Sequence, residues 1–142
     1  MPTKQKKAKA LVRQALEETF DEANVEILGE VCTTDYVHHT ALGEDVEGRE
    51  AFIAFAEGLH DAFDDLTFDI ETIIAEDDTV AVRGVVSGVH VGEFQGISPT
   101  EESVTWKSYV FARIEDGKMA ESWVLSDAMG LVQQLGATPE LA

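Results

Sequence analysis

Asp127 is the residue in this sequence best placed to move a proton, because it stands at the end of the last predicted strand. Alternation along that strand puts Trp123, Leu125 and Asp127 on one face. If this face looks inward, burial raises the pKa of the Asp127 carboxyl group and makes it a better base towards a carbon acid. Asp127 also directly precedes a predicted helix, so the alternative is an N-cap with a lowered pKa.

Two adjacent histidines are further candidates for proton transfer, and a third, His90, is a candidate for substrate binding or else a structural histidine. His38 and His39 are neighbours in an extended or turn segment, so at most one of them can face a pocket. A histidine that does so can donate a hydrogen bond to a carbonyl group or shuttle a proton, whereas the alternative is a structural histidine. His90 ends a predicted strand beside Gly92, and its direction depends on a bulge near Gly88.

Arg83 and four aromatic residues are candidates for binding a substrate. Arg83 falls in mid-strand, where it could hold Asp127 or Glu121, bind a substrate carboxylate or form an outward ion pair. The aromatic residues could line a pocket or belong to an ordinary core; they are Trp106, Tyr109, Phe111 and Trp123. The histidines have no tight ligand spacing and the chain has no cysteine pair, so we expect no metal site.

The elements that must position these residues follow a simple order. Apolar residues recur at three-to-four spacing early in the chain, which indicates helices, and alternate with polar ones after Asp65, which indicates strands. The predicted helices cover residues 5–22, 24–31, 49–63 and 128–135, and the predicted strands cover 66–73, 80–91, 104–115 and 118–126. Asn24 is a suitable N-cap, and Asp116-Gly117 favours a tight hairpin.

Helices followed by strands with short connections predict an α+β fold, in which the helices pack on one face of an antiparallel sheet. Gly84 and Gly88 lie inside a predicted strand, where they permit a sharp bend or a bulge. A bent sheet closed by helices would form a cone with a cavity. The 142 residues fit a single domain, with residues 1–8 expected to be a frayed basic end.

The charge of the chain is strongly acidic and unevenly distributed. There are 28 acidic and 10 basic residues, and five of the basic ones lie within the first 13 positions. Such a surface repels phosphates, which disfavours nucleic acid and anionic membranes as partners. A cationic partner would explain the acidity, but the acids are scattered rather than clustered, so we favour adaptation to high salt.

Cys32 is the only cysteine, so no intrachain disulfide can form. No apolar run approaches the length of a membrane span, and no secretory apolar segment follows the start. We therefore expect a cytoplasmic protein.

Several motifs in the second half of the chain resemble the SnoaL-like polyketide cyclases of the nuclear-transport-factor-2-like (NTF2-like) superfamily. They are Gly-x-His-x-Gly-Glu-Phe at 88–94, Gly-Ile-x-Pro-Thr at 96–100, Asp-Gly-Lys at 116–118 and Trp-x-x-x-Asp at 123–127. The resemblance covers roughly residues 10 to 136. It implies a cone-shaped α+β barrel, with helices on a curved antiparallel or mixed sheet of four or more strands, a hydrophobic pocket, frequent homodimers and no cofactor.

The family's characterised members close polyketide rings by an intramolecular aldol reaction, with an acidic residue near the end of the last strand as acid and base. By motif, the resemblance assigns that role to Asp127, and it favours His39 as the pocket-lining histidine. Our leading hypothesis is a cofactor-free cyclase or isomerase that acts on a small hydrophobic carbonyl compound. The rival hypothesis is a non-catalytic module of the same fold that binds a small ligand or dimerises.

The salt interpretation gives a first prediction. Raising NaCl from about 0.1 M to about 1 M shortens the Debye length from about 10 Å to about 3 Å and so screens the repulsion among carboxylates. We expect the melting temperature to rise by several degrees, as followed by circular dichroism. A melting temperature that stays constant or falls over this range would contradict the interpretation.

Overall fold

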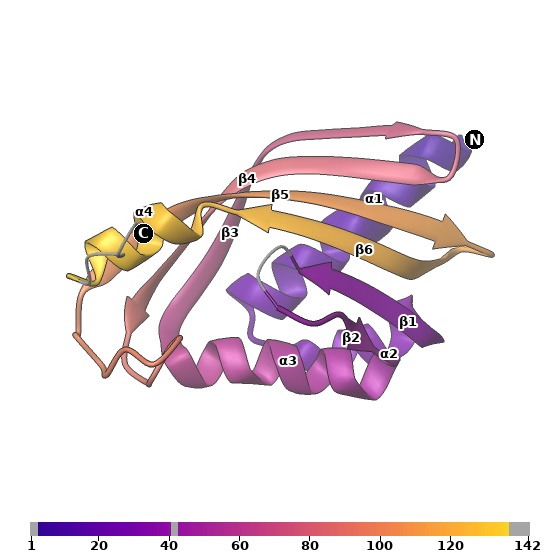
Figure 1. Ribbon diagram of the computed structural model, residues 1–142. Coiled ribbons are helices and arrows are strands. Elements are labelled where there is room, and N and C mark those ends of the chain that lie inside the picture. The colour runs from indigo at the N-terminus through magenta and orange to yellow at the C-terminus, as the bar shows by residue number, and fades with distance from the viewer. Residues whose placement is uncertain (1–2, 41–42, 137–142) are drawn as a thin grey trace.

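A six-stranded sheet with helices on one side forms the protein, as the computed structural model shows for residues 3–40 and 43–136 (Figure 1). The strands are β1 (Cys32–Thr40), β2 (Val46–Glu47), β3 (Phe63–Glu76), β4 (Thr79–His90), β5 (Ser103–Glu115) and β6 (Lys118–Ser126). Their order across the sheet is β2-β1-β6-β5-β4-β3. All neighbouring pairs are antiparallel except β1 and β6, which are parallel.

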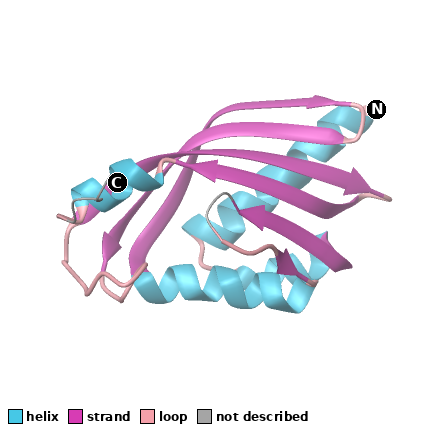
Figure 2. Ribbon diagram, in the orientation of Figure 1, coloured by secondary structure: helices cyan, strands magenta, loops and turns pink. Residues whose placement is uncertain are grey.

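The helical elements are α1 (Lys4–Leu16), the π-helical turn η1 (Glu17–Asp21), the 3-10 turn η2 (Val25–Ile27), α2 (Leu28–Val31), α3 (Arg49–Ala62) and α4 (Ala128–Gln134). Helices α1 and α3 lie on the same side of the sheet, and no helix within residues 3–40 and 43–136 covers the opposite side of β4, β5 and β6 along most of its length (Figure 2). We call the covered side the inner face and the uncovered side the outer face.

The N-terminal helix begins earlier than the sequence suggested. Thr3 caps α1, because its hydroxyl oxygen accepts a hydrogen bond from the Lys6 backbone N–H at 3.1 Å. Residues from Lys4 onwards are therefore helical, where we expected a frayed end. Ala8 and Val12 are buried on the face of α1 that packs on the sheet.

Two bulges in β3 bend the sheet, and each lies opposite a glycine of β4. The β3–β4 register shifts between Ile70 and Thr72, beside Gly84, and between Asp64 and Thr67, beside Gly88. A Cβ atom on Gly84 would collide with the Phe68 ring, so only glycine allows this close approach. The prediction that these glycines accommodate a bend or bulge is confirmed.

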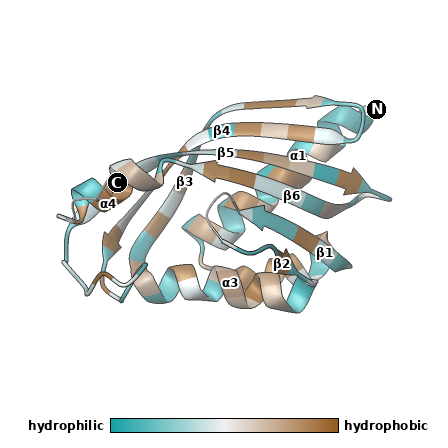
Figure 3. Cartoon of the chain, viewed as in Figure 1, coloured by the Kyte–Doolittle hydropathy of each residue, from teal (hydrophilic) through white to brown (hydrophobic). Residues whose placement is uncertain are grey.

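Burial alternates along β5, as expected for a strand of a sheet with one covered face. Hydrophobic and hydrophilic residues both occur along β5 and β6 (Figure 3). Along β5, every second residue from Val104 to Ile114 is buried, and these side chains form the core together with α1 and α3. The predicted α+β class is confirmed, and the sheet is mixed and open along the edges β2 and β3.

Two local predictions differ from the structure. The segment that contains Tyr36 and His38 is a full strand, β1, whereas the sequence predicts an extended or turn segment. Asn24 makes no capping bond; its side-chain amide donates instead to Glu18 Oε1 at 3.1 Å, so the second helical segment begins without the predicted side-chain cap.

Candidate functional site

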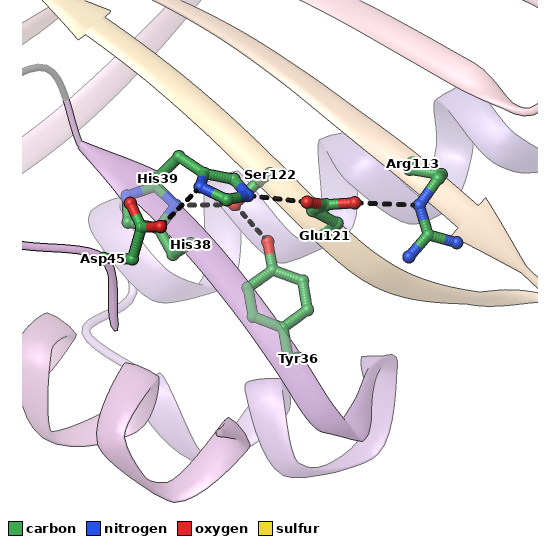
Figure 4. A network of polar contacts seen from close by, with 7 residues as sticks. All are labelled: Tyr36, His38, His39, Asp45, Arg113, Glu121 and Ser122. Carbon is green, nitrogen blue, oxygen red and sulfur yellow. Dashed lines mark hydrogen bonds and ion pairs between the residues drawn. The ribbon is translucent and has the colours of Figure 1, made fainter. Parts of the chain in front are cut away.

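The inner face carries a buried polar cluster of three side chains, Tyr36, His38 and Ser122 (Figure 4). Ser122 Oγ lies 2.6 Å from His38 Nδ1 and is also hydrogen-bonded to the Tyr36 hydroxyl. Tyr36 is fully buried, and His38 and Ser122 are nearly so. The hydrogen bonds among the described residues use His38 Nδ1 and leave Nε2 unpaired.

The parallel pairing of β1 with β6 assembles this cluster. His38 is the register partner of Ser122, and residues directly opposite each other in a sheet project on the same face. Tyr36 lies two residues before His38 and so shares that face. From the other side, Phe52 and Phe55 of α3 pack on the His38 ring, with centroids 4.8 and 5.5 Å away.

The apolar surroundings keep His38 uncharged. Burial is the main cause that lowers the pKa of His38 to about 4, and the neighbouring charge of His39 acts in the same direction. Burial also raises the pKa of the Tyr36 hydroxyl, so Tyr36 stays protonated. At neutral pH the cluster is therefore a set of three neutral groups whose hydroxyl protons can rotate to satisfy either tautomer of His38.

His39 belongs to a different cluster, on the outer face of the same strands (Figure 4). Its Nε2 lies 2.6 Å from Glu121 Oε2, and its Nδ1 lies 3.0 Å from Asp45 Oδ2. The hydrogen bond to Glu121 is the main cause that raises the pKa of His39, and the same bond lowers the pKa of Glu121. Arg113 Nε completes the cluster at 3.1 Å from Glu121 Oε1.

This outer cluster has a structural role, because it links segments of the chain. A carboxylate near each ring nitrogen favours the imidazolium form of His39, and the ring ties β6 to the segment before β2. Its ring also stacks on Trp123, with centroids 5.2 Å apart. His39 therefore does not line the inner face, contrary to the role that the resemblance favoured; His38 occupies that face.

The structure places Asp127 as a helix cap. Its carboxylate Oδ1 accepts a hydrogen bond from the Gly130 backbone N–H at 2.9 Å, at the start of α4, and the residue is exposed. Trp123 and Leu125 are exposed as well, so the face that they share with Asp127 looks outward. The inward orientation on which the catalytic hypothesis for Asp127 depended is wrong, and the capping alternative agrees with the geometry.

The predicted substrate-binding residues divide between the two faces. Arg83, Tyr109 and Phe111 lie on the outer face with Trp123, and Arg83 donates a hydrogen bond to Thr72 Oγ1 at 2.8 Å. For Arg83 this agrees with the alternative of an outward ion pair, since its Nε lies 3.9 Å from Glu71 Oε1. For Tyr109, Phe111 and Trp123 the outward direction contradicts an inner pocket that they line. Trp106 is on the inner face, where it packs beside Phe63 with centroids 5.3 Å apart.

His90 is also on the inner face, fully buried at the end of β4. Its Nδ1 accepts a hydrogen bond from the Thr100 backbone N–H at 3.2 Å, so the proton of the neutral ring is on Nε2. That Nε2 has no hydrogen-bond partner within residues 3–40 and 43–136. A buried donor without a partner is rare. The unpaired Nε2–H of His90 lies in an apolar environment that includes the ring of Phe63.

The sequence reasoning missed Tyr36 and Ser122 and preferred the wrong histidine of the pair. A usable signal existed, since Tyr36 and His38 are two residues apart and therefore share one face of an extended segment. Ser122 was hidden for a different reason. A bulge shifts the β5–β6 register between Arg113 and Ile114, so Met119 and Ala120 are both buried and the alternation reverses before Trp123.

The part of the chain that the structure describes has hollows on its surface. One, of about 770 Å³, lies between the start of α1 and the β3–β4 and β5–β6 turns; another, of about 380 Å³, lies beside Ser87, Thr105 and Gln134. Neither is lined by the His38 cluster. Within residues 3–40 and 43–136 no three His, Cys, Asp or Glu side chains are grouped to hold a metal ion, and no helix has the length and apolar character to cross a membrane.

Comparisons with known proteins identify the family. The family model for SnoaL-like polyketide cyclases matches residues 10–135, so the chain belongs to the SnoaL-like polyketide cyclase family. No match was found among curated proteins.

Solved structures show the same fold. A proposed SnoaL-like polyketide cyclase from Jannaschia sp. CCS1 is 23% identical, with a TM-score of 0.87 and 95% of each chain covered. AclR, a proposed hydroxylase from Streptomyces galilaeus, is 30% identical, with a TM-score of 0.82 over 95% of this chain and 88% of its own. IdmH, a proposed polyketide cyclase from Streptomyces antibioticus, is 26% identical, with a TM-score of 0.78 over 92% of this chain and 99% of its own.

The pKa values of His38 and His39 are shifted in opposite directions, which predicts opposite pH dependences of the free energy of unfolding. Because the pKa of His38 is lower in the folded state, the unfolded chain takes up its proton first as the pH falls. The free energy of unfolding of the wild type should therefore drop relative to His38→Gln by about 2 kcal/mol between pH 6.5 and pH 5. Urea unfolding of both proteins at the two pH values measures this difference.

The matched variant is His39→Gln, for which we expect the opposite change of the free energy of unfolding with pH. Because the pKa of His39 is raised, its stabilisation is present below the unfolded pKa and is lost as the pH rises through the folded pKa. The wild type should thus lose stability relative to His39→Gln above neutral pH. Equal pH dependence in the wild type and both variants would show that neither environment is as described.

Proposed function

We propose that this protein is a cofactor-independent enzyme of the cyclase or isomerase type, which moves a proton next to the carbonyl group of a small hydrophobic polyketide- or ester-like compound. The observation that carries the proposal is that His38 is neutral and hydrogen-bonded to Ser122 on the inner face. Membership of the SnoaL-like family and the likeness to IdmH support a polyketide-like substrate.

His38 takes the role of acid and base in this proposal. In the tautomer in which Nδ1–H donates to Ser122 Oγ, the Nε2 lone pair is free to accept a proton. The C–H bond next to the carbonyl breaks, its proton moves to Nε2 and its electron pair remains as the enolate. The enolate carbon attacks a second carbonyl of the same molecule, and the resulting alkoxide takes the proton back from Nε2.

The low pKa of His38 keeps the ring in its base form at neutral pH, although it also lowers the strength of the ring as a base. An uncharged imidazole is available as a base at every pH well above 4, and burial keeps water from competing for its proton. When the proton is transferred, the new enolate and the imidazolium form an ion pair, which raises the pKa of His38 for as long as the intermediate lasts. The return of the proton to the product then restores the neutral ring.

Ser122 and Tyr36 are positioning residues, because they orient the ring of His38 without contact to the reacting carbon. His39 acts one step further away: its bond to Glu121 holds β1 in register with β6. His90 and Trp106 are the predicted binding residues that remain on the inner face. We infer that the unpaired His90 Nε2–H donates to an acceptor oxygen of the ligand, and that Trp106 contributes apolar contact.

We infer that the enzyme works in the cytoplasm as a homodimer and needs no metal or cofactor for the aldol step.

The rival function is a non-catalytic module of the same fold that binds a small ligand. This rival has support because one fold can host many activities, and AclR is described as a hydroxylase rather than a cyclase.

A proton-exchange assay tests the proposal without knowledge of the natural substrate. An aromatic β-keto ester with an α-methyl group is incubated in buffered D₂O, and proton NMR follows loss of the signal of the hydrogen between the carbonyls. The wild type should accelerate exchange over buffer, and His38→Gln should lower the enzymatic rate by at least about a hundredfold. Ser122→Ala should retain part of the rate, because it removes only the group that orients the ring.

Asp127→Asn is the matched control, because asparagine is also a good N-cap and the change removes the carboxylate. It should keep both the exchange rate and the melting temperature of the wild type. Loss of exchange in Asp127→Asn with His38→Gln unaffected would contradict the proposal and restore Asp127 as the catalytic group. Tight binding of the keto ester with no exchange by the wild type would favour the non-catalytic rival.

A further inference from the structure

Phe55 of α3 is an exposed aromatic residue that lies over a buried polar cluster. It follows Phe52 by three residues, so both rings project from the same side of the helix. The two rings pack on His38, with centroids 5.5 Å and 4.8 Å from the centroid of the imidazole. Phe55 is nevertheless 38% exposed, whereas His38 is only 6% exposed. The Phe55 ring thus has His38 on one side and solvent on another.

The two phenylalanines differ in how firmly they are held. Phe52 packs on Tyr36 as well, with centroids 4.7 Å apart, and against the apolar core. In the part of the chain that the structure describes, the aromatic contacts of Phe55 are those with His38 and with Phe52, whose centroid is 6.4 Å away. Exposed side chains change rotamer readily, and buried ones do not. Phe55 is therefore the ring that can turn towards solvent and uncover His38.

Phe55 covers the end of the polar cluster that lies towards Thr40. Phe52 contacts both Tyr36 and His38, whereas Phe55 contacts His38, so β1 and α3 run past each other in the same direction here. Alternation makes Thr40 the next residue of β1 that projects on the inner face after His38. Thr40 therefore lies beyond His38 on the side of Phe55.

The inner face is partly exposed at this position. Thr40 and its register partner Val124 are half-buried, whereas His38, two residues earlier on β1, is buried. A small molecule that approaches along this part of the sheet meets Phe55 before it reaches the imidazole ring. The rotamer of one side chain thus decides how much room there is beside His38.

We propose that Phe55 is a specificity-determining residue, whose ring closes the approach to His38 and limits the size of the hydrophobic carbonyl compound that reaches Nε2. The inference rests on the proposed function for its chemistry. A compound with a small group next to the reacting carbon is admitted when the Phe55 ring turns outward, whereas a bulky group needs the space that the ring occupies. In the closed position the ring also shields His38 from water.

Chemical modification tests the shielding without any substrate. Diethyl pyrocarbonate acylates neutral imidazole nitrogens, and tandem mass spectrometry separates modified His38 from modified His39. Phe55→Ala should raise the rate of His38 modification at least about tenfold at about pH 7, because that rate follows the population in which the ring is uncovered. Phe55→Leu should raise it less, since leucine keeps part of the cover. Ile74→Ala is the matched control and should leave the rate unchanged, because Ile74 is an exposed apolar residue on β3.

The exchange assay tests the specificity with two α-methyl β-keto esters, one a methyl ketone and the other a naphthyl ketone. Phe55→Ala should raise the exchange rate of the naphthyl compound relative to the methyl compound at least about tenfold. Circular dichroism verifies that each variant is folded. An unchanged ratio of the two rates, or modification of His38 in Phe55→Ala at the wild-type rate, would overturn the proposal. Absence of exchange in both proteins would contradict the proposed function instead, while the modification rates still decide whether Phe55 covers His38.

Discussion

The parallel pairing of β1 with β6 is the constraint on which the rest of the structure depends. It joins the first strand of the chain to the last, and its register sets His38 opposite Ser122 and His39 opposite Trp123. Because side chains alternate between faces, one register serves two purposes. It builds a neutral cluster inside and an ion-pair cluster outside, and a shift by one residue would destroy both.

The two adjacent histidines show how completely the surroundings decide the chemistry of a side chain. His38 is buried away from solvent and contacts neutral side chains, so its pKa is lowered. His39 lies beside two carboxylates, so its pKa is raised. The ion pairs of His39 and Arg113 with Glu121 are on the outer face, behind Ser122. The charged cluster thereby fixes the strands that carry the neutral one, while the sheet keeps its charges out of the apolar interior.

The sequence was sufficient for most of the fold and for little of the site. Periodicity located α3 and the long strands to within a few residues, and Gly84 and Gly88 indicated the bends, because these features are set by local sequence. The site depends on pairing between distant strands and on which way each strand faces. The bulge before Trp123 reversed the expected alternation of β6, and this single extra residue turned Trp123, Leu125 and Asp127 outward.

The most direct test of the account is the ionisation of His38 in solution. Nitrogen-15 NMR of histidine-labelled protein, with His38→Gln for assignment, follows each imidazole from about pH 4 to about pH 9. We predict that His38 remains neutral down to about pH 5 and that His39 stays charged above the pH at which a free histidine loses its proton. A His38 ring that titrates like a free imidazole would contradict the buried neutral cluster from which the proposed function is built.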